Sequence, residues 1–173
     1  MKPAKTTAQK MIKVDHAGEN GAVNIYRAQS FVARFRNPSL RQELIDFQKH
    51  EEHHRKLFAE YLKKHNLRPC VSYHLCGLGG FFLGTATGLI GKKAVFATTY
   101  AVENVVLKHL IHQMDYLKGL DREAYQCVNE IVIDEQEHHD VAENQIDPNS
   151  ILSRLLIRIV KLSTEAVIRF GMR

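Results

Sequence analysis

Two short stretches of this chain carry a glutamate and a histidine three positions apart. They are Glu51 with His54 and Glu135 with His138. On an α-helix this spacing puts a carboxylate and an imidazole on the same face, one turn apart. A further glutamate precedes each pair by 32 positions, Glu19 before Glu51 and Glu103 before Glu135. The chain therefore contains two copies of one unit, offset by 84 residues.

Four carboxylates and two imidazoles that project from four antiparallel helices match the donor set of a dinuclear, carboxylate-bridged metal centre. Oxygen-rich sites with two histidines favour iron or manganese, whereas a structural zinc site favours cysteine. The expected metal ligands are Glu19, Glu51, His54, Glu103, Glu135 and His138. The opposing interpretation is that these acidic, histidine-rich runs are solvated helix faces. The matched spacing of the two units favours the metal centre.

The residues around Glu51 argue against a solvated face. In the expected second helix one stripe contains Leu40, Leu44, Phe47, Glu51, His54, Phe58 and Leu62. Unpaired charge on a line that faces the core is unfavourable. The carboxylate and the imidazole on this stripe therefore need a partner inside the protein.

A second metal motif overlaps the same stretch. Residues 50–54 also fit the His-Glu-x-x-His pattern of zinc hydrolases, in which the two outer histidines bind zinc and Glu51 is the general base. This interpretation leaves Glu135 and His138 without a role. We therefore prefer the dinuclear centre.

Hydrophobic periodicity and breaker residues predict an all-α chain with one domain over residues 1–173. After a polar tail, residues 1–13, the expected long helices are 14–36, 39–66, 94–117, 122–145 and 151–170. Asn37-Pro38-Ser39 separates the first two, and Ser39 with Gln42 is the expected capping box of the second. Asp147-Pro148-Asn149-Ser150 precedes the last. His139 and Asp140 lie beside the second motif and are candidates for orienting the ligands.

The segment between Pro69 and Gly91 has no acidic or strongly basic residue. Gly80, Gly84 and Gly88 recur every four positions, which gives a small-residue face that permits close helix approach. The apolar part is too short and too glycine-rich to predict a membrane span. Insertion into a membrane surface and packing as a helical hairpin inside the protein fit this segment equally well.

The last expected helix is amphipathic. Its apolar side contains Ile151, Leu152, Leu155, Leu156, Ile159, Ser163, Ala166, Val167 and Phe170. Its polar side contains Arg154, Arg158, Lys161, Glu165 and Arg169. A basic amphipathic helix suits an anionic membrane surface. The alternative is a bundle helix that buries its apolar side and turns its polar side to water.

Composition limits the partners and the compartment. The 24 basic and 19 acidic residues give a net charge of +5, which favours anionic partners such as nucleic acid or phospholipid headgroups. Three cysteines without metal-ligand spacing indicate a reducing compartment. The N-terminal residues lack the apolar core of a secretory signal, and no glycine-rich phosphate loop is present.

Longer motifs resemble one enzyme family. They are Asp15-His16-Ala17-Gly18-Glu19-Asn20-Gly21-Ala22, Glu51-x-x-His54, Val102-Glu103 and Asp134-Glu135-Gln136-Glu137-His138-His139-Asp140. Together they are similar to the demethoxyubiquinone hydroxylases of ubiquinone biosynthesis, over nearly the whole chain. The resemblance implies a ferritin-like four-helix bundle with a Gly-rich apolar helix inserted between helices 2 and 3 and an additional C-terminal amphipathic helix. It also implies that Glu19 and Glu103 are terminal iron ligands, Glu51 and Glu135 bridge two iron ions, and His54 and His138 are imidazole ligands.

The same resemblance implies a reaction. It is hydroxylation of 2-polyprenyl-3-methyl-6-methoxy-1,4-benzoquinol with O₂, with NADH as the electron donor. The implied protein is bound peripherally to a membrane, with a lipid-binding accessory protein and other ubiquinone-biosynthesis proteins as partners and no nucleic acid. The missing N-terminal presequence favours the cytoplasmic face of a bacterial inner membrane. Two alternatives stay open: a ferritin-like iron storage or ferroxidase protein, and a soluble di-iron hydroxylase that acts on tRNA.

Overall fold

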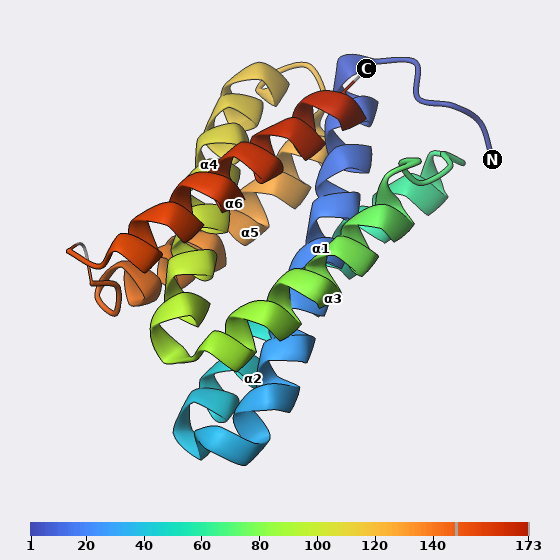
Figure 1. Cartoon of the computed structure of the whole chain (residues 1–173). Helices are drawn as coiled ribbons and strands as arrows, with labels where there is room; N and C mark the ends of the chain where they lie inside the picture. Colours follow the sequence, from blue (N-terminus) through green and yellow to red (C-terminus); the bar gives the residue numbers. More distant parts are fainter. Residues whose placement is uncertain (148, 173) are drawn as a thin grey trace.

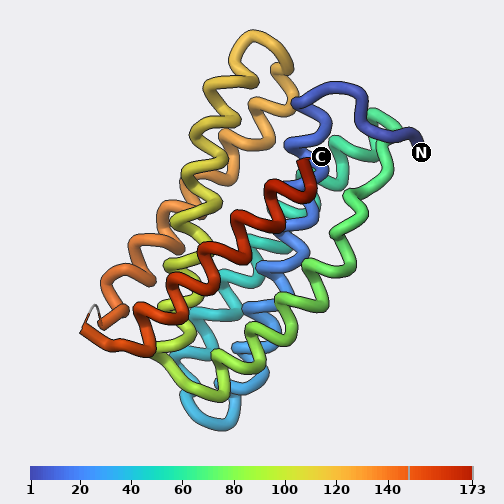
Figure 2. Tube along the Cα trace, turned by 45° about the horizontal axis from the view of Figure 1, so that its top comes forward, coloured from blue at the N-terminus to red at the C-terminus, as the bar shows by residue number. Residues whose placement is uncertain are grey.

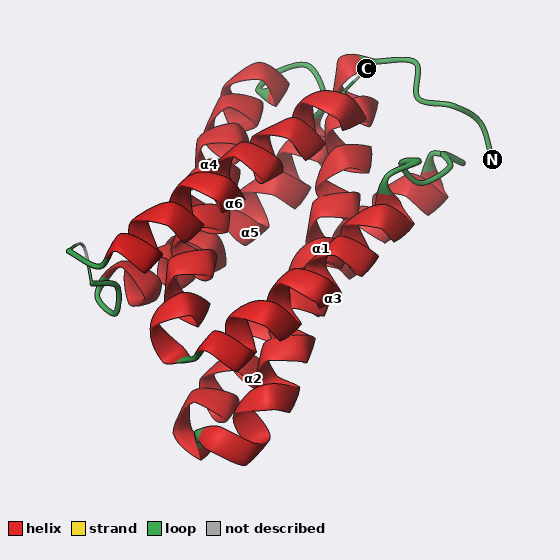
Figure 3. Ribbon diagram, viewed as in Figure 1, coloured by secondary structure: helices red, strands yellow, loops and turns green. Residues whose placement is uncertain are grey.

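The computed structural model describes residues 1–147 and 149–172, and this part of the chain forms six α-helices and no β-strand. The helices are α1 (Thr7–Arg36), α2 (Pro38–Lys64), α3 (Tyr73–Ile90), α4 (Lys92–Leu117), α5 (Arg122–Glu143) and α6 (Ile151–Gly171). Figures 1 and 3 show a long bundle of these helices. The predicted all-α, ferritin-like fold is therefore confirmed. Pro148, part of the expected break before α6, lies outside the described residues.

The bundle is built from two helical hairpins. Helix α1 packs against α2, α4 packs against α5, and contacts between α2 and α5 join the two hairpins. The inserted helix α3 lies along α1, and the C-terminal helix α6 lies along α4. Figures 1 and 2 show α3 and α6 on the same side of the bundle. The two added helices therefore cover the same face of the bundle.

The first helix begins earlier than the sequence pattern predicts. It starts at Thr7 rather than Val14, so the predicted polar tail is wrong for most of its length. The Thr6 side chain caps the helix by accepting a hydrogen bond from the backbone N–H of Gln9. Ile12 in this first part of the helix is fully buried. Capping and burial together extend the helix through a segment that looks polar in sequence.

The second helix has a different cap from the one predicted. Asn37 caps it, because its side chain accepts a hydrogen bond from the backbone N–H of Leu40. Pro38 occupies the first turn, where its missing N–H is no loss. The predicted capping box of Ser39 and Gln42 is therefore wrong, and the Ser39 hydroxyl instead donates to Asn37 Oδ1. The other helix boundaries agree with the prediction to within two residues.

Two clusters of buried apolar side chains lie toward opposite ends of the bundle. One cluster includes Ile12, Phe58, Leu62, Leu110, Leu117, Val128 and Ile131. The other includes Tyr26, Leu44, Phe47, Val95, Phe96 and Ala142. On each of the four bundle helices the predicted ligands fall between these two clusters. The polar centre is therefore enclosed by apolar packing at both ends.

Helix α3 approaches α1 through its glycines. A Cβ atom at Gly80 would collide with the backbone carbonyl of Gly21, and one at Gly84 would collide with that of Ile25. The opposite face of α3 is exposed and apolar, with Leu78 and Phe82 more than half accessible to solvent. The helix is therefore packed on one face and uncovered on the other. Packing inside the protein describes the first face, and insertion into a membrane surface remains an interpretation of the second. By length and composition alone α3 could cross a membrane, but its packing along α1 argues for lying beside the bundle.

Helix α6 does not bury its apolar side. Only Ser153 and Val160 of this helix are fully buried against the bundle. Leu155, Ile159 and Phe170 on the predicted apolar side are each more than half exposed. The alternative of a bundle helix with a buried apolar side is therefore wrong. Helices α3 and α6 both present apolar side chains on the side of the bundle that they cover.

Candidate metal centre

All six predicted ligands meet in the middle of the bundle. Glu19 comes from α1, Glu51 and His54 from α2, Glu103 from α4, and Glu135 and His138 from α5. None of the six residues is more than 5% exposed. Since isolated buried charges are strongly unfavourable, such a concentration of carboxylates calls for compensating positive charge.

The six residues form two overlapping groups of donor atoms. One group contains Glu19, Glu51, His54 and Glu135, and the other contains Glu51, Glu103, Glu135 and His138. Within each group one donor atom per residue lies within 4.8 Å of all the others. Glu51 and Glu135 belong to both groups. This is the arrangement that two bridging carboxylates and four terminal ligands require.

The donor atoms converge without satisfying one another. His54 Nδ1 lies 3.1 Å from Glu135 Oε1, and His138 Nδ1 lies 3.1 Å from Glu51 Oε1. Nevertheless both Nδ1 atoms, together with Glu51 Oε1, are buried without a partner in hydrogen-bonding geometry. Buried polar atoms are normally paired. Oxygen and nitrogen atoms that face a common centre in this way fit the donor set of iron or manganese ions.

Burial and mutual repulsion disturb the acid–base equilibria of the centre. Burial, with the neighbouring carboxylates adding to it, raises the pKa of Glu19 and of Glu103 well above the ordinary value. Burial also acts to raise the pKa of Glu51, but interactions with His138 and His54 outweigh it and hold that pKa well below its usual range. The metal-free centre must therefore hold protons where two divalent cations would otherwise supply positive charge.

The outward-facing nitrogens of the two imidazoles have different partners. His54 Nε2 lies 3.1 Å from Asp134 Oδ2. His138 Nε2 lies 3.1 Å from His50 Nδ1, and the two rings stack at an interplanar angle of 6°. These contacts turn each Nδ1 toward the centre. Partners of this kind fix the orientation of metal-binding histidines.

Tyr26 is a further partner of the centre. Its hydroxyl donates a 2.8 Å hydrogen bond to Glu103 Oε1. The ring is buried and meets the His138 ring edge-on, with 6.1 Å between centroids. Burial, with the Glu103 charge adding to it, raises the pKa of Tyr26 well above its ordinary value, so the phenol keeps its proton. Tyr26 therefore fixes one oxygen of Glu103.

Sequence reasoning missed these orienting residues. It named His139 and Asp140 for that role, but the structure pairs these two with each other and places the His139 ring against Tyr100. Asp134 and His50 stand immediately before the two bridging glutamates in sequence, which was the available signal. His50 lies in neither donor group, so the zinc-hydrolase motif does not assemble.

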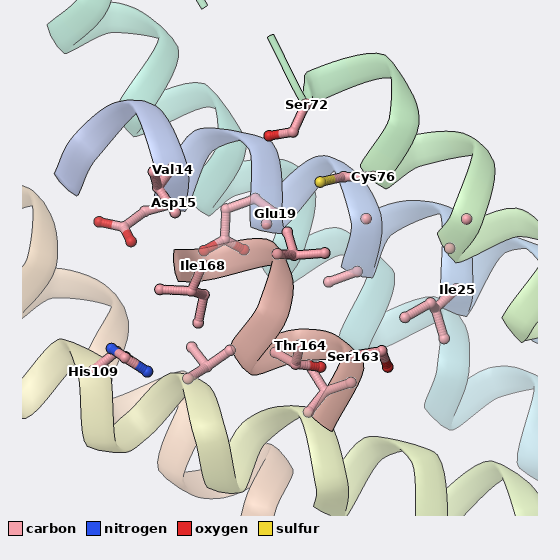
Figure 4. Close-up of a pocket in the computed structure, with 18 of the residues that line it drawn as sticks. Val14, Asp15, Glu19, Ile25, Ser72, Cys76, His109, Ser163, Thr164 and Ile168 are labelled. Carbon is pink, nitrogen blue, oxygen red and sulfur yellow. The ribbon is translucent and has the colours of Figure 1, made fainter. Parts of the chain in front are cut away.

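A cavity opens from the centre toward the space between α3 and α6. It has a volume of about 640 Å³, and its wall includes Glu19, Glu51, Glu103 and Glu135 at the inner end. Most of the remaining wall is apolar and comes from Val102 and Val106 of α4, Leu75 and Leu83 of α3, and Val167 and Ile168 of α6. Figure 4 shows Glu19 on α1 and Ile168 on α6, which both line this cavity. The buried polar centre thus adjoins this largely apolar cavity, which we call the chamber.

Asp15 adds one more carboxylate to this cavity, a turn before Glu19 on α1. Its Oδ1 accepts a 2.9 Å hydrogen bond from Gln113 Nε2 on α4, while its Oδ2 is buried and has no partner among the described residues. Burial raises the pKa of Asp15 to about 7, although the Gln113 hydrogen bond acts in the opposite direction. Asp15 therefore lies in the wall of the chamber with one oxygen free.

Comparison with known proteins identifies the family. A family model described as "Ubiquinone biosynthesis protein COQ7" matches residues 6–171. The chain belongs to this family. A similar protein of Mus musculus, "NADPH-dependent 3-demethoxyubiquinone 3-hydroxylase, mitochondrial", is 33% identical and covers 98% of this chain and 79% of its own length. "3-demethoxyubiquinol 3-hydroxylase" of Rhodospirillum rubrum is 33% identical and covers 76% of this chain and 62% of its own length.

The resemblance inferred from the four motifs is therefore confirmed as membership of the COQ7 family. A Dictyostelium discoideum relative with the same name as the mouse protein is 30% identical over 95% of this chain and 76% of its own length. The matched span contains both copies of the glutamate–histidine unit, as well as α3 and α6. Membership thus covers the centre and both helices that border the chamber.

Proposed function

We propose that this chain hydroxylates the ring of 2-polyprenyl-3-methyl-6-methoxy-1,4-benzoquinol with O₂, as a 3-demethoxyubiquinol 3-hydroxylase of ubiquinone biosynthesis. One observation carries the proposal: a buried, two-group centre of carboxylates and imidazoles opens into an apolar chamber of about 640 Å³. The names of the relatives support the substrate class. The chamber supports an apolar substrate that reaches the centre away from bulk water.

Two iron ions fit the residues present. Glu19 and Glu103 would be terminal ligands, Glu51 and Glu135 bridging ligands, and the Nδ1 atoms of the two histidines would complete the two groups. When bound, an iron pair supplies electrons to O₂, which by itself reacts poorly with a closed-shell ring. The unpaired donor atoms at the centre support this assignment.

The side chains of the chain itself bind and enclose the substrate. Val102, Val106 and Leu110 of α4 offer apolar contacts beside Glu103 for a substituted ring. The chamber continues between α3 and α6, where a polyprenyl tail would leave the core. Apolar walls also exclude water from the reacting ring, which limits side reactions.

Two electrons must come from outside the substrate and O₂. The resemblance implies NADH as their source, whereas several relatives are named as NADPH-dependent. Both nucleotides therefore belong in the test.

Membrane contact would explain the uncovered faces of α3 and α6. Leu78, Phe82, Leu155 and Phe170 expose apolar surface on the two helices that border the chamber. We propose that these faces rest on a bilayer, so that the lipid substrate enters between α3 and α6. The three free cysteines agree with a reducing compartment, and we propose the cytoplasmic face of a bacterial inner membrane.

Other proteins are also expected at this location. A lipid-binding accessory protein and other ubiquinone-biosynthesis proteins would share the membrane surface with this chain. Iron storage and tRNA hydroxylation account for the metal centre, but they give no reason for an apolar chamber bordered by two uncovered apolar helices.

An isotope experiment tests the reaction. Iron-loaded protein is incubated with a short-tail demethoxyubiquinol analogue, ¹⁸O₂ and either NADH or NADPH. The expected product is the ring-hydroxylated quinol with one labelled oxygen, and His138→Ala should abolish it. Reductant consumption that yields only peroxide would reject the hydroxylase. Label in tRNA from a parallel incubation without the quinol would favour the nucleic-acid alternative, and continued iron uptake without product would favour storage.

A further inference from the structure

Asp15 in the wall of the chamber and Gln113 of α4 form a polar pair, and each has a buried oxygen without a partner. The pair is joined by the 2.9 Å hydrogen bond from Gln113 Nε2 to Asp15 Oδ1. Asp15 Oδ2 and Gln113 Oε1 are both buried and have no hydrogen-bond partner among the described residues. A buried polar atom without a hydrogen-bond partner is unfavourable. Two unpaired oxygens at one place therefore call for a hydrogen-bond donor.

Three other polar side chains of the chamber wall already have partners. The Ser72 hydroxyl contacts Cys70 Sγ at 3.1 Å, and the Ser163 hydroxyl donates to the backbone carbonyls of its own helix. His109 Nε2 lies 3.4 Å from Glu165 Oε2. Outside the metal-ligand set, Asp15 thus offers the free buried oxygen of the wall.

Asp15 lies close enough to the metal centre to contact a substrate ring that is bound beside it. Asp15 precedes Glu19 by four residues, which is about 6 Å along the helix axis. Figure 4 shows Asp15 and Glu19 on successive turns of α1 and Ile168 on α6, and all three residues line the same cavity. Because Asp15 and Glu19 line the same cavity, a substituted ring bound near Glu19 could present an oxygen substituent to Asp15.

We propose that Asp15, held in place by Gln113, accepts a hydrogen bond from a ring hydroxyl of the substrate and thereby selects the quinol over the quinone. The inference rests on the proposed function, because it assigns a contact to that substrate. A quinol has two hydroxyl donors, whereas the quinone of the same size has only carbonyl oxygens. A quinone oxygen facing Asp15 Oδ2 would leave the carboxylate unpaired and would be repelled by it.

A binding measurement separates the two redox forms without turnover. Ferrous protein is dialysed anaerobically at about pH 8 against the short-tail demethoxyubiquinol or the corresponding quinone, and free ligand is measured by chromatography. Hydrogen bonds to charged groups contribute about 1.5–3 kcal/mol, so the wild-type chain should bind the quinol at least about tenfold more tightly. In Asp15→Leu, which has a similar size, this preference should disappear.

Three variants make the result specific. Asp15→Asn keeps a neutral acceptor and should retain a reduced preference of about two- to fivefold, since neutral hydrogen bonds are weaker. Gln113→Leu removes the group that holds Asp15 and should also reduce the preference. Asp115→Asn removes an exposed carboxylate of α4 and should leave the ratio as in the wild type. Iron content and helicity are checked for each variant.

The outcomes distinguish this inference from the proposed function. A wild-type preference that survives in Asp15→Leu, or a wild-type chain that binds both forms equally, overturns the role of Asp15 alone. A wild-type chain that binds neither form overturns the proposed function as well. Loss of the preference in Asp15→Leu, with partial retention in Asp15→Asn, supports the inference.

Discussion

His138 Nε2 lies 3.1 Å from His50 Nδ1, and the two imidazole rings are nearly parallel. The other histidine of the centre, His54, has a carboxylate in the corresponding place, Asp134. The two donor groups thus have equivalent ligand types but different outer partners. A carboxylate makes a stronger, charge-assisted hydrogen bond to an imidazole N–H than a neutral ring does. We expect the two metal positions to be unequal for this reason.

Asp134→Ala should weaken metal binding more than His50→Ala does. Loss of an orienting carboxylate typically lowers metal affinity by about 10–100-fold. Loss of the His50 partner should have a smaller effect, about 3–10-fold, because its hydrogen bond to His138 is not assisted by the charge of a carboxylate. Titration of both variants with Co²⁺ against a competing chelator measures the two affinities. Equal losses, or a greater loss in His50→Ala, would contradict the proposed inequality.

Glu51→Ala should remove both metal ions rather than one. Glu51 belongs to both donor groups, so its loss leaves each group one carboxylate short. Glu137→Ala is the matched control, since Glu137 is an exposed glutamate of α5. Iron per chain, measured after gel filtration, should fall from about two to near zero in Glu51→Ala and stay unchanged in the control. Retention of one iron in Glu51→Ala would show that this carboxylate does not bridge.

The candidate ligands could be found from sequence because each lies on the core-facing line of a long, regular helix. Spacing along one helix fixes which side chains share a face, so Glu51 and His54 were predictable together. The contacts of Asp134 with His54 and of Gln113 with Asp15 could not be predicted, because they depend on how two helices are rotated against each other. The exposure of the apolar side of α6 could not be predicted from sequence either, because an amphipathic pattern does not show whether protein, membrane or water covers the apolar face.

The metal-free protein should lose stability as the pH rises from about 5.5 to about 8.5. Burial raises the pKa of Asp15 to about 7. Burial would lower the pKa of His54, but Glu135 and Glu51 raise it to about 11. In this range the folded chain therefore holds protons that the unfolded chain has released, so the free energy of unfolding falls with pH. Each extra proton contributes about 1.4 kcal/mol per pH unit.

Urea denaturation of the metal-free protein and of the Mn²⁺-loaded protein at the two pH values measures this dependence. Metal binding requires deprotonated ligands, so the stabilisation by Mn²⁺ should grow as the pH rises. The lowered pKa of Glu51 acts at more acidic pH and does not affect this range. Burial lowers the pKa of His16 to about 4, which opposes the trend near pH 5.5, but the proton that Asp15 holds there offsets it. Asp15→Asn should flatten the curve of the metal-free protein. If the urea midpoint of the metal-free protein rose from about pH 5.5 to about pH 8.5, the folded chain would not hold the excess protons expected here.

Gly80→Ala should destabilise the fold, whereas Gly79→Ala should not. The added methyl at Gly80 meets the backbone carbonyl of Gly21, which cannot move away as a flexible side chain could. Overpacking of this kind costs about 1–3 kcal/mol. A Cβ at Gly79 has no heavy atom within 4 Å, so alanine should gain up to about 1 kcal/mol of helix propensity. Thermal unfolding should give shifts of opposite sign, and equal shifts would mean that α3 does not pack closely on α1.

Charge reversal on α6 should weaken binding to anionic vesicles. Arg154 and Arg158 are exposed beside the uncovered apolar side of this helix. Lys161 is excluded from the variant because its Nζ donates to Asn104 Oδ1 at 2.7 Å and lies over the ring of Tyr100. Each basic residue near an anionic surface contributes about 1 kcal/mol. Replacing both arginines with glutamate should therefore reduce the fraction that floats with phosphatidylglycerol vesicles by more than tenfold.

The apolar part of vesicle binding has its own matched pair of variants. Leu155→Ser removes an exposed leucine from α6, and Ile133→Ser removes an exposed isoleucine from α5, which packs against α4 and α2 rather than beside the chamber. Only Leu155→Ser should lower flotation, because burial of a leucine in the membrane interface contributes about 1.5–3 kcal/mol. Added salt should weaken wild-type binding by screening the arginines but leave the leucine contribution in place. A wild-type chain that does not float at any salt concentration would mean that the exposed faces of α3 and α6 bind another protein surface instead.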